Sequence, residues 1–399
     1  MAKPVVVDKT YLGKGNKLSE YLFAGLKVID CATVIAAPAA AMMLADYGAD
    51  VIKIEQPGEG DMLRILGDLP TTPYADSDWF WQLDGRNKRG MALDLKQPAG
   101  LEILRKLVAG CDVFITNQPY SVRESLGITY EDLKPLNPSL IYGSLTAYGE
   151  KGPERYRKGF DQLAYWARSG LMELMREPGT SPTQGLPGMG DHPTAVALYA
   201  GIVTALLKRE RSGEGGMVET SLLANGLWSV AGIAQGVMAN GDMPLYRSLN
   251  KSPPAMMRPY ETSDGRWLQF NMIRNEDLQS LLFVALDAPE LLSDLRFNSQ
   301  ELMFENRELL GLELQKSSNK IHPNTGFRHS ILLNYPSISL RWWRKARMIR
   351  RSCRIRWHLR QKTTGSRHRS LLITRFKYPM YRRWGPCVHR LWVNTTRRF

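Results

Sequence analysis

The sequence is poor in histidine and cysteine, and both shortages limit the chemistry that it can support. Only one of its six histidines, His192, lies among residues 1–315. Most histidine-based metal sites and serine–histidine–aspartate triads are therefore excluded there. The four cysteines form no CxxC pair and no disulfide framework. We expect no metal site and a reducing, cytoplasmic location.

Several nucleotide and hydrolase signatures are also missing. A nicotinamide-dinucleotide site needs the glycines of G-x-G-x-x-G after its first strand, whereas this chain reads TVIAAPAAA there. No G-x-x-x-x-G-K-[ST] and no G-x-S-x-G occurs, which argues against P-loop enzymes and serine hydrolases. The first residues, MAKPVVVDKTYLGKGNKLSEY, hold no apolar signal-peptide stretch. The longest apolar run, 31–45, is too short to cross a bilayer.

Acidic residues are missing from residues 316–399. That segment holds 22 lysines and arginines and no carboxylate, whereas residues 1–315 hold 31 basic and 39 acidic residues. It also holds five of the ten tryptophans. Because natural disordered tails are usually poor in aromatic residues, we favour translation in a shifted reading frame as its origin. The alternative is a segment that binds single-stranded nucleic acid through arginine and tryptophan.

The first part of the chain alternates strands and helices. LKVIDCATVI (26–35) is typical of a buried strand, AAPAAAMMLADYGA of a helix, and DVIKIE (50–55) of a second strand. Such a unit predicts a parallel sheet with right-handed crossovers. Further along, Asp264 and Gly265 between two strand-like runs predict a hairpin. We expect an α/β fold, with a Rossmann-like parallel sheet in a large domain and a smaller α+β domain.

One carboxylate occupies an unusual position in GLPGMGDHPTAVALYAG (185–201). Asp191 lies between a glycine-rich loop and a helical run, where aspartate often caps the helix by accepting a backbone N–H bond. A carboxylate kept ionised by a helix N-terminus can also attack a thioester and form an acyl anhydride. Gly185, Gly188 and Gly190 would let the backbone approach a bulky acyl-CoA closely. The cap and the nucleophile are compatible roles.

Five ordered motifs carry a resemblance to a known family. They are LKVIDCATVIAAPAAAMMLADYGADVIKIEQPGEGD, NKRGMALDLKQPAG, YGEKGPERYRKGFD, GMGDHPTA and LLKRERSGEGGMVETSL. Together they resemble the class III CoA-transferases (the CaiB/BaiF family), which include formyl-CoA transferase, carnitine CoA-transferase and α-methylacyl-CoA racemase. The resemblance covers about residues 24–310. It is greatest to transferases that act on 2-hydroxyacyl and aromatic acyl acids.

The resemblance implies transfer of CoA between an acyl-CoA donor and a carboxylic acid, through an aspartyl acyl anhydride and an aspartyl-CoA thioester. The family's nucleophile falls on Asp191, and coenzyme A enters as a substrate. The family's CoA contacts fall on Val34, Ile35, Ala36, Gln56, Leu93, Lys96, Asn117, Gln118, Leu126 and Lys158. Of these, Lys96 and Lys158 can meet phosphates, and Asn117 can bond the pantetheine or adenine.

The same resemblance divides the chain. Residues 1–225 would form the CoA-binding, Rossmann-like large domain, and residues 226–315 the first part of the small domain. Residues 316–399 fall outside the family pattern, and we expect this tail to be disordered or poorly packed. Family chains return from the small domain to the large one and form interlocked homodimers, but nothing after about Gln315 resembles that return segment.

Several positions depart from the family. Members often carry arginine where this chain has Gln56 and Ser125, so the grip on phosphate is expected to shift, for example to Arg123. Phe160 stands where formyl-CoA transferase has an active-site tyrosine and where racemases have a catalytic histidine. Phenylalanine cannot move a proton, so a transferase is favoured over the alternative, an acyl-CoA racemase. Asp161 is then expected to cap or to hydrogen-bond locally.

Overall fold

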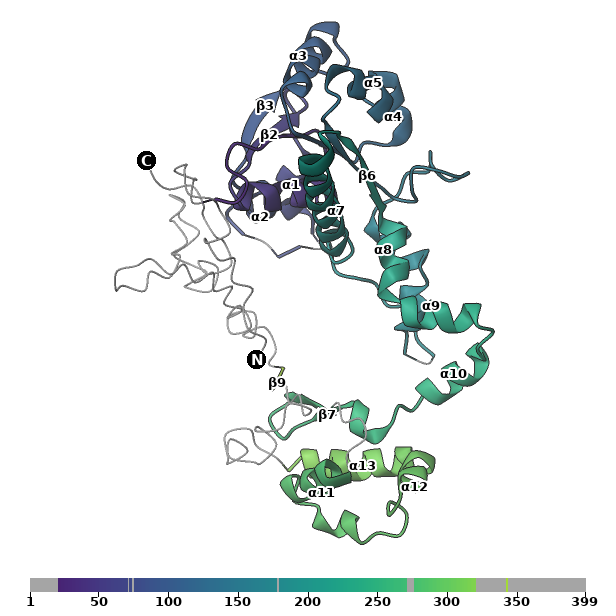
Figure 1. Cartoon of the computed structure of the whole chain (residues 1–399). Coiled ribbons are helices and arrows are strands. Elements are labelled where there is room, and N and C mark those ends of the chain that lie inside the picture. Colours follow the sequence, from purple (N-terminus) through teal and green to yellow (C-terminus); the bar gives the residue numbers. More distant parts are fainter. Residues whose placement is uncertain are drawn as a thin grey trace, which may run out of the picture. The chain divides into compact units, whose positions relative to one another are not determined.

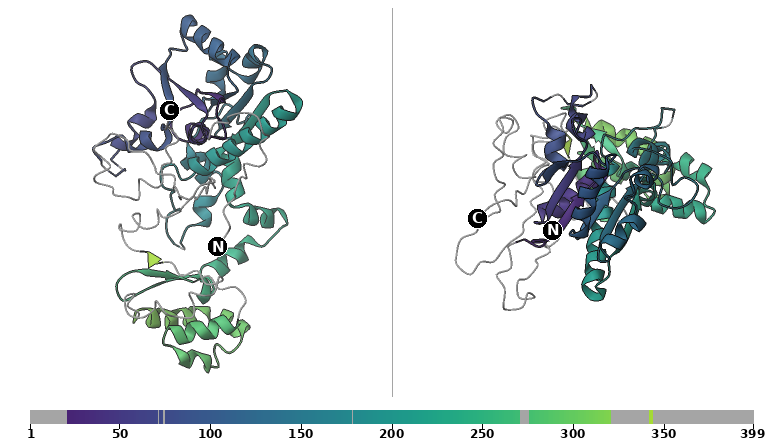
Figure 2. Two further views of the ribbon diagram at one scale, coloured as in Figure 1. Left: turned by 60° about the vertical axis from the view of Figure 1, so that its left-hand side comes forward. Right: turned by 90° about the horizontal axis from the view of Figure 1, so that it is seen from above.

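The computed structural model of the chain describes residues 21–320, except 71, 74, 178 and 271–275, together with residues 342–343. The chain divides into two compact units, and the boundary lies between Gly236 and Val237. The larger unit carries a parallel sheet covered by helices, and the smaller one carries helices and short antiparallel strands (Figures 1 and 2). None of the helices in the described ranges combines the length and hydropathy needed to cross a membrane.

The larger unit is built on six strands in the order β3-β2-β1-β4-β5-β6. They are β1 (Lys27–Asp30), β2 (Asp50–Glu55), β3 (Arg89–Ala92), β4 (Val113–Thr116), β5 (Ile141–Thr146) and β6 (Gly216–Ser221). Every neighbouring pair is parallel. Because both faces are covered, the four residues of β4 are all buried. The predicted α/β fold with a Rossmann-like parallel sheet is confirmed.

Helices fill the connections between these strands. They are α1 (Ala36–Asp46), η2 (Met62–Arg64), η3 (Leu66–Asp68), α2 (Trp79–Asp84), α3 (Pro98–Ala109), α4 (Tyr120–Leu126), α5 (Tyr130–Leu133), η4 (Lys134–Leu136), η5 (Gln162–Ala167, a π-helix), α6 (Leu171–Leu174) and α7 (Asp191–Ser212). After the last strand follow α8 (Leu222–Ser229) and α9 (Ala231–Met238). The alanine-rich α1 packs against α7 (Figure 1).

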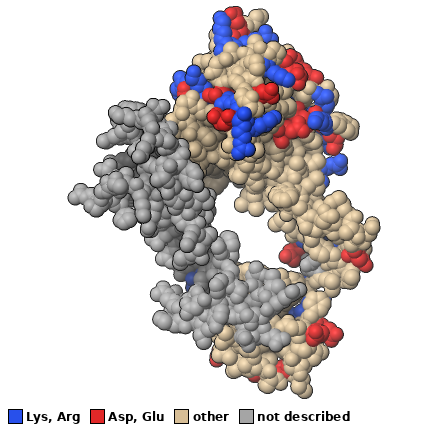
Figure 3. Space-filling view, viewed as in Figure 1, with Lys and Arg blue, Asp and Glu red and all other residues tan. Residues whose placement is uncertain are grey.

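Each face of the sheet has its own apolar core. Successive side chains of a strand point to opposite faces, so Val28 lies in the core that contains α1 and α7, and Ile29 in the core that contains α3 and α5. On the face shown in Figure 3, lysine and arginine of the larger unit are interspersed with aspartate and glutamate. This mixture differs from the single-sign patch typical of nucleic-acid-binding surfaces.

The smaller unit is an α+β arrangement. Its elements are α10 (Met243–Asn250), η6 (Ala255–Met257), β7 (Pro259–Glu261), β8 (Trp267–Gln269), α11 (Glu276–Ala285), η7 (Pro289–Leu292), α12 (Gln300–Glu305), α13 (Arg307–Ser318) and β9 (Trp342–Trp343). β7 and β8 form the predicted hairpin, and Gly265 takes the left-handed conformation that its turn requires, with φ of 71°. The strands lie antiparallel in the order β7-β8-β9.

The predictions for the acid-free tail concern residues that the structure largely leaves undescribed. From residue 321 onward only Trp342–Trp343 is described, as the short strand β9 beside β8. For the first residues of the tail the expected disorder or poor packing was wrong, because residues 316–318 complete α13 and Ser317 and Ser318 are buried there. For the rest of the tail it stays a prediction.

Candidate active site

The carboxyl ends of the parallel strands bring the candidate residues to one edge of the sheet. In doubly wound sheets, ligands bind at this edge where the strand order reverses. The reversal lies between β1 and β4, which are followed by residues 33–36 and 117–118. β6 follows α7 and runs parallel to β5, so the N-terminus of α7 lies at this edge too. The topology thus places Asp191 at the same edge as these five of the ten expected CoA contacts, and as Gln56 and Leu93, which directly follow β2 and β3.

Asp191 is half-buried and is the first residue of α7. The N-cap is Gly190, and the Asp191 side chain makes no capping hydrogen bond. The capping role expected from the sequence was therefore wrong, because the helix begins at Asp191 itself and its carboxylate lies in the first turn. In the described part of the chain, no group hydrogen-bonds this carboxylate, so both oxygens are available for chemistry.

The environment of Asp191 favours its neutral form. Burial raises the pKa of Asp191 to about 7, and the nearby carboxylates of Asp161 and Asp84 add to the rise, while His192 opposes it. Burial thus opposes the helix N-terminus, which we expected to keep this carboxyl group ionised. Asp191 is consequently an anion mainly above pH 7.

Asp161 fixes the turn that precedes the nucleophile. Its buried carboxylate accepts the backbone N–H of Gly190 at 3.2 Å. This partner lies 29 residues away, and the expected local bond accompanies it, because the backbone N–H of the neighbouring Gln162 also bonds the carboxylate. Burial raises the pKa of Asp161. The bond to Gly190 ties the start of η5 to the start of α7 and so sets the position of Asp191.

The glycines before Asp191 serve protein packing. A Cβ atom on Gly185 would lie 2.1 Å from the Trp166 ring, and one on Gly190 would lie 2.7 Å from the Tyr165 ring. Gly188 has φ of 76°, a conformation that favours glycine. We had expected these glycines to admit acyl-CoA. In the structure the close approach is made by aromatic side chains of η5.

His192, the single histidine of residues 1–315, pairs with a carboxylate that the sequence did not reveal. Its Nε2 lies 3.2 Å and 3.3 Å from the two oxygens of Asp84, the last residue of α2. The Asp84 side chain is fully buried, and 38% of the His192 side chain is exposed. Burial would lower the pKa of His192, but the pairing with Asp84 outweighs it and the pKa is raised.

A buried ionic network holds the loop between β1 and α1. Asp61 accepts the backbone N–H of Val34 at 2.9 Å and the Thr33 hydroxyl at 3.0 Å, and it pairs with Lys53 at 2.7 Å. Burial alone would raise the pKa of Asp61, but Lys53 and the N–H donors outweigh it and lower the pKa. Val34 is held with φ of 66°, a strained value for a β-branched residue.

The same ionic network also includes Asp30 and Lys88. Asp30 at the end of β1 lies 2.8 Å from Lys88, and Lys53 also bonds the Ala32 carbonyl. The sequence analysis missed all four charged members of this network. The sequence did contain a signal for Asp61, because this residue is the last one of the IEQPGEGD stretch in the first family motif. It contained no signal for Asp84.

Asn117 joins the loop from the neighbouring strand. Its side-chain oxygen accepts the Thr33 N–H and its amide donates to the Thr33 carbonyl, both at 2.8 Å. Both polar atoms of the amide are thus engaged, although we had expected them to bond pantetheine or adenine. Gln118 beside it is half-buried.

The other expected CoA contacts differ in exposure. Ile35 and Ala36 are buried at the start of α1, and Val34 is half-buried. Leu93 and Leu126 pack against the apolar core on the α3 side. The three remaining residues, Gln56, Lys96 and Lys158, are exposed.

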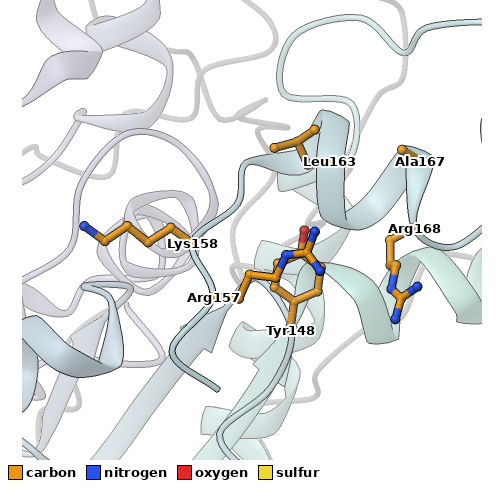
Figure 4. Close-up of a pocket in the computed structure, with 6 residues that line it drawn as sticks. All are labelled: Tyr148, Arg157, Lys158, Leu163, Ala167 and Arg168. Atoms are coloured by element: carbon orange, nitrogen blue, oxygen red, sulfur yellow. The ribbon is translucent and has the colours of Figure 1, made fainter. Parts of the chain in front are cut away.

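Lys158 lines a shallow pocket of about 400 Å³. The lining residues are Tyr148, Arg157, Lys158, Leu163, Ala167 and Arg168 (Figure 4). Arg157 lies over the Tyr148 ring, 5.1 Å from its centroid. Glu154 pairs with Arg157 at 2.6 Å and with Arg168 at 3.3 Å. Two arginines thus share one carboxylate, and Lys158 points away from them (Figure 4); the surplus of positive charge suits a phosphate group.

Arg123 does not take over the role of the missing family arginines. Its side chain is buried and pairs with Glu150 at 2.7 Å, and it donates to the Ser144 hydroxyl at 3.1 Å. The expected shift of phosphate binding to Arg123 was therefore wrong. A buried arginine bound to a buried glutamate cannot reach a ligand without leaving that carboxylate unpaired.

A doubly wound parallel sheet with a half-buried carboxylate at its carboxyl edge is an arrangement typical of α/β enzymes. The chain belongs to the CoA-transferase family III, whose sequence model matches residues 23–321. It is an enzyme of this class, and the family resemblance inferred from the motifs is confirmed.

Relatives of known activity support this placement. The chain is 36% identical to (R)-2-hydroxy-4-methylpentanoate CoA-transferase of Clostridioides difficile over 288 residues, covering 72% of this chain and 71% of that protein. It is 34% identical to cinnamoyl-CoA:phenyllactate CoA-transferase of Clostridium sporogenes, covering 72% and 70%. The crystal structure of a CaiB/BaiF family protein from Brucella suis matches with a TM-score of 0.68 and 29% identity, covering 79% of this chain and 83% of that one.

Proposed function

We propose that this chain moves CoA from an acyl-CoA to a carboxylic acid with the Asp191 carboxylate as nucleophile. Asp191 attacks the thioester carbonyl, the C–S bond breaks, and CoA leaves as a thiolate, which produces a mixed anhydride. The thiolate attacks the aspartyl carbonyl and releases the donor acid, leaving an aspartyl-CoA thioester. The acceptor carboxylate then attacks this thioester, and the released thiolate attacks the new acyl group. The second acyl-CoA departs and the Asp191 carboxylate is restored.

The observation that carries this proposal is the position of Asp191. Its carboxylate lies at the carboxyl edge of the sheet and has no hydrogen-bond partner among the described residues. Asp191 also lies at the positive end of a helix of 22 residues, whose dipole can stabilise a developing negative charge, although the N–H groups of His192 and Thr194 are already bonded to the Gly188 and Gly190 carbonyls. A free carboxylate in a position that partly excludes water is thus available at one residue.

The acyl group that we propose is a 2-hydroxyacyl or aromatic acyl group. Two relatives are named for 2-hydroxy-4-methylpentanoate and for cinnamoyl-CoA with phenyllactate. Phe160 exposes 62% of its surface and directly precedes Asp161, which is bonded to the turn before Asp191. An exposed aromatic ring near the nucleophile suits such a group. We further propose that the protein is cytoplasmic and forms a homodimer, as inferred from the sequence. The proposal includes no specific nucleic-acid partner and no membrane partner.

The test is to trap the covalent intermediate. The full chain is mixed with an acyl-CoA and hydroxylamine, and the peptides are examined by mass spectrometry. We expect a hydroxamate on Asp191. Asp191→Asn should lower transfer by on the order of 10³ or more while CoA binding changes little, since the amide has nearly the same shape. Labelling that survives in Asp191→Ala would contradict the proposal.

A racemase of the same family is the nearest alternative, and Phe160 separates the two reactions. A racemase needs two groups that move the α-proton, and position 160 offers a side chain without a titratable group. We expect a chiral 2-methylacyl-CoA to exchange its α-proton with deuterium oxide no faster than in a blank. Rapid exchange, followed by NMR, would assign the chain to the racemases.

A further inference from the structure

The pair formed by Asp84 and His192 has no part in the proposed chemistry, although it lies next to the nucleophile. Asp84 is fully buried, and its hydrogen-bond partner in the described part of the chain is the His192 ring, at 3.2 Å and 3.3 Å. A buried carboxylate is costly unless a cation or several donors compensate it. This arrangement therefore calls for a positive charge on His192.

The second ring nitrogen supports the same protonation state. The Gly188 carbonyl faces the His192 side chain and favours its charged form. Gly188 also lies close to the ring, since a Cβ atom on this glycine would be 3.3 Å from Nδ1 of His192. The Gly188 carbonyl already accepts the His192 backbone N–H at 3.0 Å, but a carbonyl oxygen can accept a second hydrogen bond. A doubly protonated imidazolium therefore finds an acceptor beside each of its ring nitrogens.

We propose that Asp84 and His192 act as a positioning pair that holds a positive charge beside Asp191 and thereby enlarges its ionised, nucleophilic fraction. The inference rests on the proposed role of Asp191. His192 follows Asp191 in the first turn of α7, whereas Asp84 comes from α2 and lies behind the ring. The buried carboxylate fixes the ring and keeps it protonated, and the imidazolium acts on the nucleophile.

Three charged groups act on Asp191, and the pair changes their balance. Asp161 and Asp84 disfavour the Asp191 anion, and His192 favours it. Lys88 lies near Asp84 as well and interacts with it electrostatically. With His192 charged, its own charge offsets that of Asp84. Without it, Asp191 would face two carboxylates.

The experiment follows the rate of Asp191 adduct formation against pH in single-turnover reactions of the full chain. The variants are His192→Gln, which keeps an amide donor for Asp84, and the double variant Asp84→Asn/His192→Gln, which removes both charges. Lys208→Gln is the matched control, because it removes one positive charge at the exposed far end of the same helix. The wild-type rate should rise as the pH passes through about 7.

For His192→Gln we expect the rising limb to move to higher pH by about one pH unit, since a nearby opposite charge has been lost. At pH 6 the adduct should then form about tenfold more slowly than in the wild type, and at pH 9 at a nearly equal rate. The double variant should lie between the wild type and His192→Gln, because it also loses the repulsion of Asp84, and Lys208→Gln should not move the profile. An equal loss at every pH in His192→Gln, or a double variant displaced as far as His192→Gln, would overturn the proposal.

A second measurement does not depend on catalysis. NMR of ¹³C-labelled histidine reports the titration of His192, whose signal is identified by its loss in His192→Gln. We expect His192 to stay protonated to higher pH in the wild type than in Asp84→Asn, and an equal titration would overturn the pairing. If no adduct forms on Asp191 in any protein, the proposed function fails, whereas this titration still decides whether the pair holds a charge.

Discussion

Asp191 shows how a residue placed for chemistry lowers the stability of the folded chain. Its raised pKa means that the folded state binds a proton which the unfolded state releases near pH 4. The contribution of Asp191 to stability is therefore highest below pH 4, falls as the pH rises from about 4 to about 7, and is constant above. At 1.36 kcal/mol per pKa unit, this rise corresponds to a loss of about 4 kcal/mol if the environment does not relax.

Asp191→Asn should therefore be more stable than the wild type at pH 8. The amide occupies nearly the same volume and carries no charge to desolvate. The gain should be absent near pH 4 and should reach about 1 to 4 kcal/mol above pH 7. Denaturant unfolding at several pH values measures it, with Asp50→Asn at an exposed ion pair as the control. A variant less stable than the wild type at pH 8 would refute this account of the site.

On the scale of the element, the loop between β1 and α1 depends on Asp61. This carboxylate holds Val34 in its strained conformation and compensates Lys53. Removing one partner of a buried pair typically costs about 3–5 kcal/mol. We expect Asp61→Asn to lose stability in this range and to bind acyl-CoA more weakly, because residues 33–36 are no longer fixed.

The matched comparison is again Asp50→Asn, whose partner Arg89 is largely exposed. Such surface pairs contribute about 0–1 kcal/mol. Chemical denaturation measures the stability difference, and titration with CoA measures binding. If both aspartate variants behave alike, the loop is not held by Asp61.

Local patterns predicted the elements, whereas long-range pairing decided the site. The strand–helix alternation, the hairpin at Gly265 and the start of α7 follow from periodicity and turn residues within a few positions. Asp84 and His192 are 108 residues apart, and the Thr33–Asn117 bonds span 84. Such contacts depend on strand order, which no local pattern encodes. The role of Arg123 was missed for the same reason, because Glu150 occupies it from another connection.

On the scale of the whole molecule, the acid-free tail is the main anomaly. The family match ends at residue 321, close to Lys316, where the carboxylates stop. We predict that residues from about 316 onward are a frame-shifted translation. The measurement is to read the gene: one of the other two frames downstream of codon 310 should encode an acid-containing α/β continuation. The expressed chain should aggregate and bind polyanions with a steep salt dependence.

Two findings together would refute this prediction. They are the absence of such a continuation in either frame and a purified chain that is soluble and unfolds cooperatively. The nucleic-acid interpretation of the basic segment would then gain support.

All six strands of the large sheet, and Asp191 itself, precede Leu222 in the chain. Synthesis proceeds from the N-terminus, at about 5–20 residues per second, and domains form largely in that order. The ribosome therefore needs roughly 5 to 20 seconds to travel from codon 222 to codon 316. This interval is long compared with the milliseconds to seconds in which chains of mixed α/β type commonly fold. A change of reading frame near codon 316 would thus reach a nascent chain whose sheet and nucleophile are already assembled.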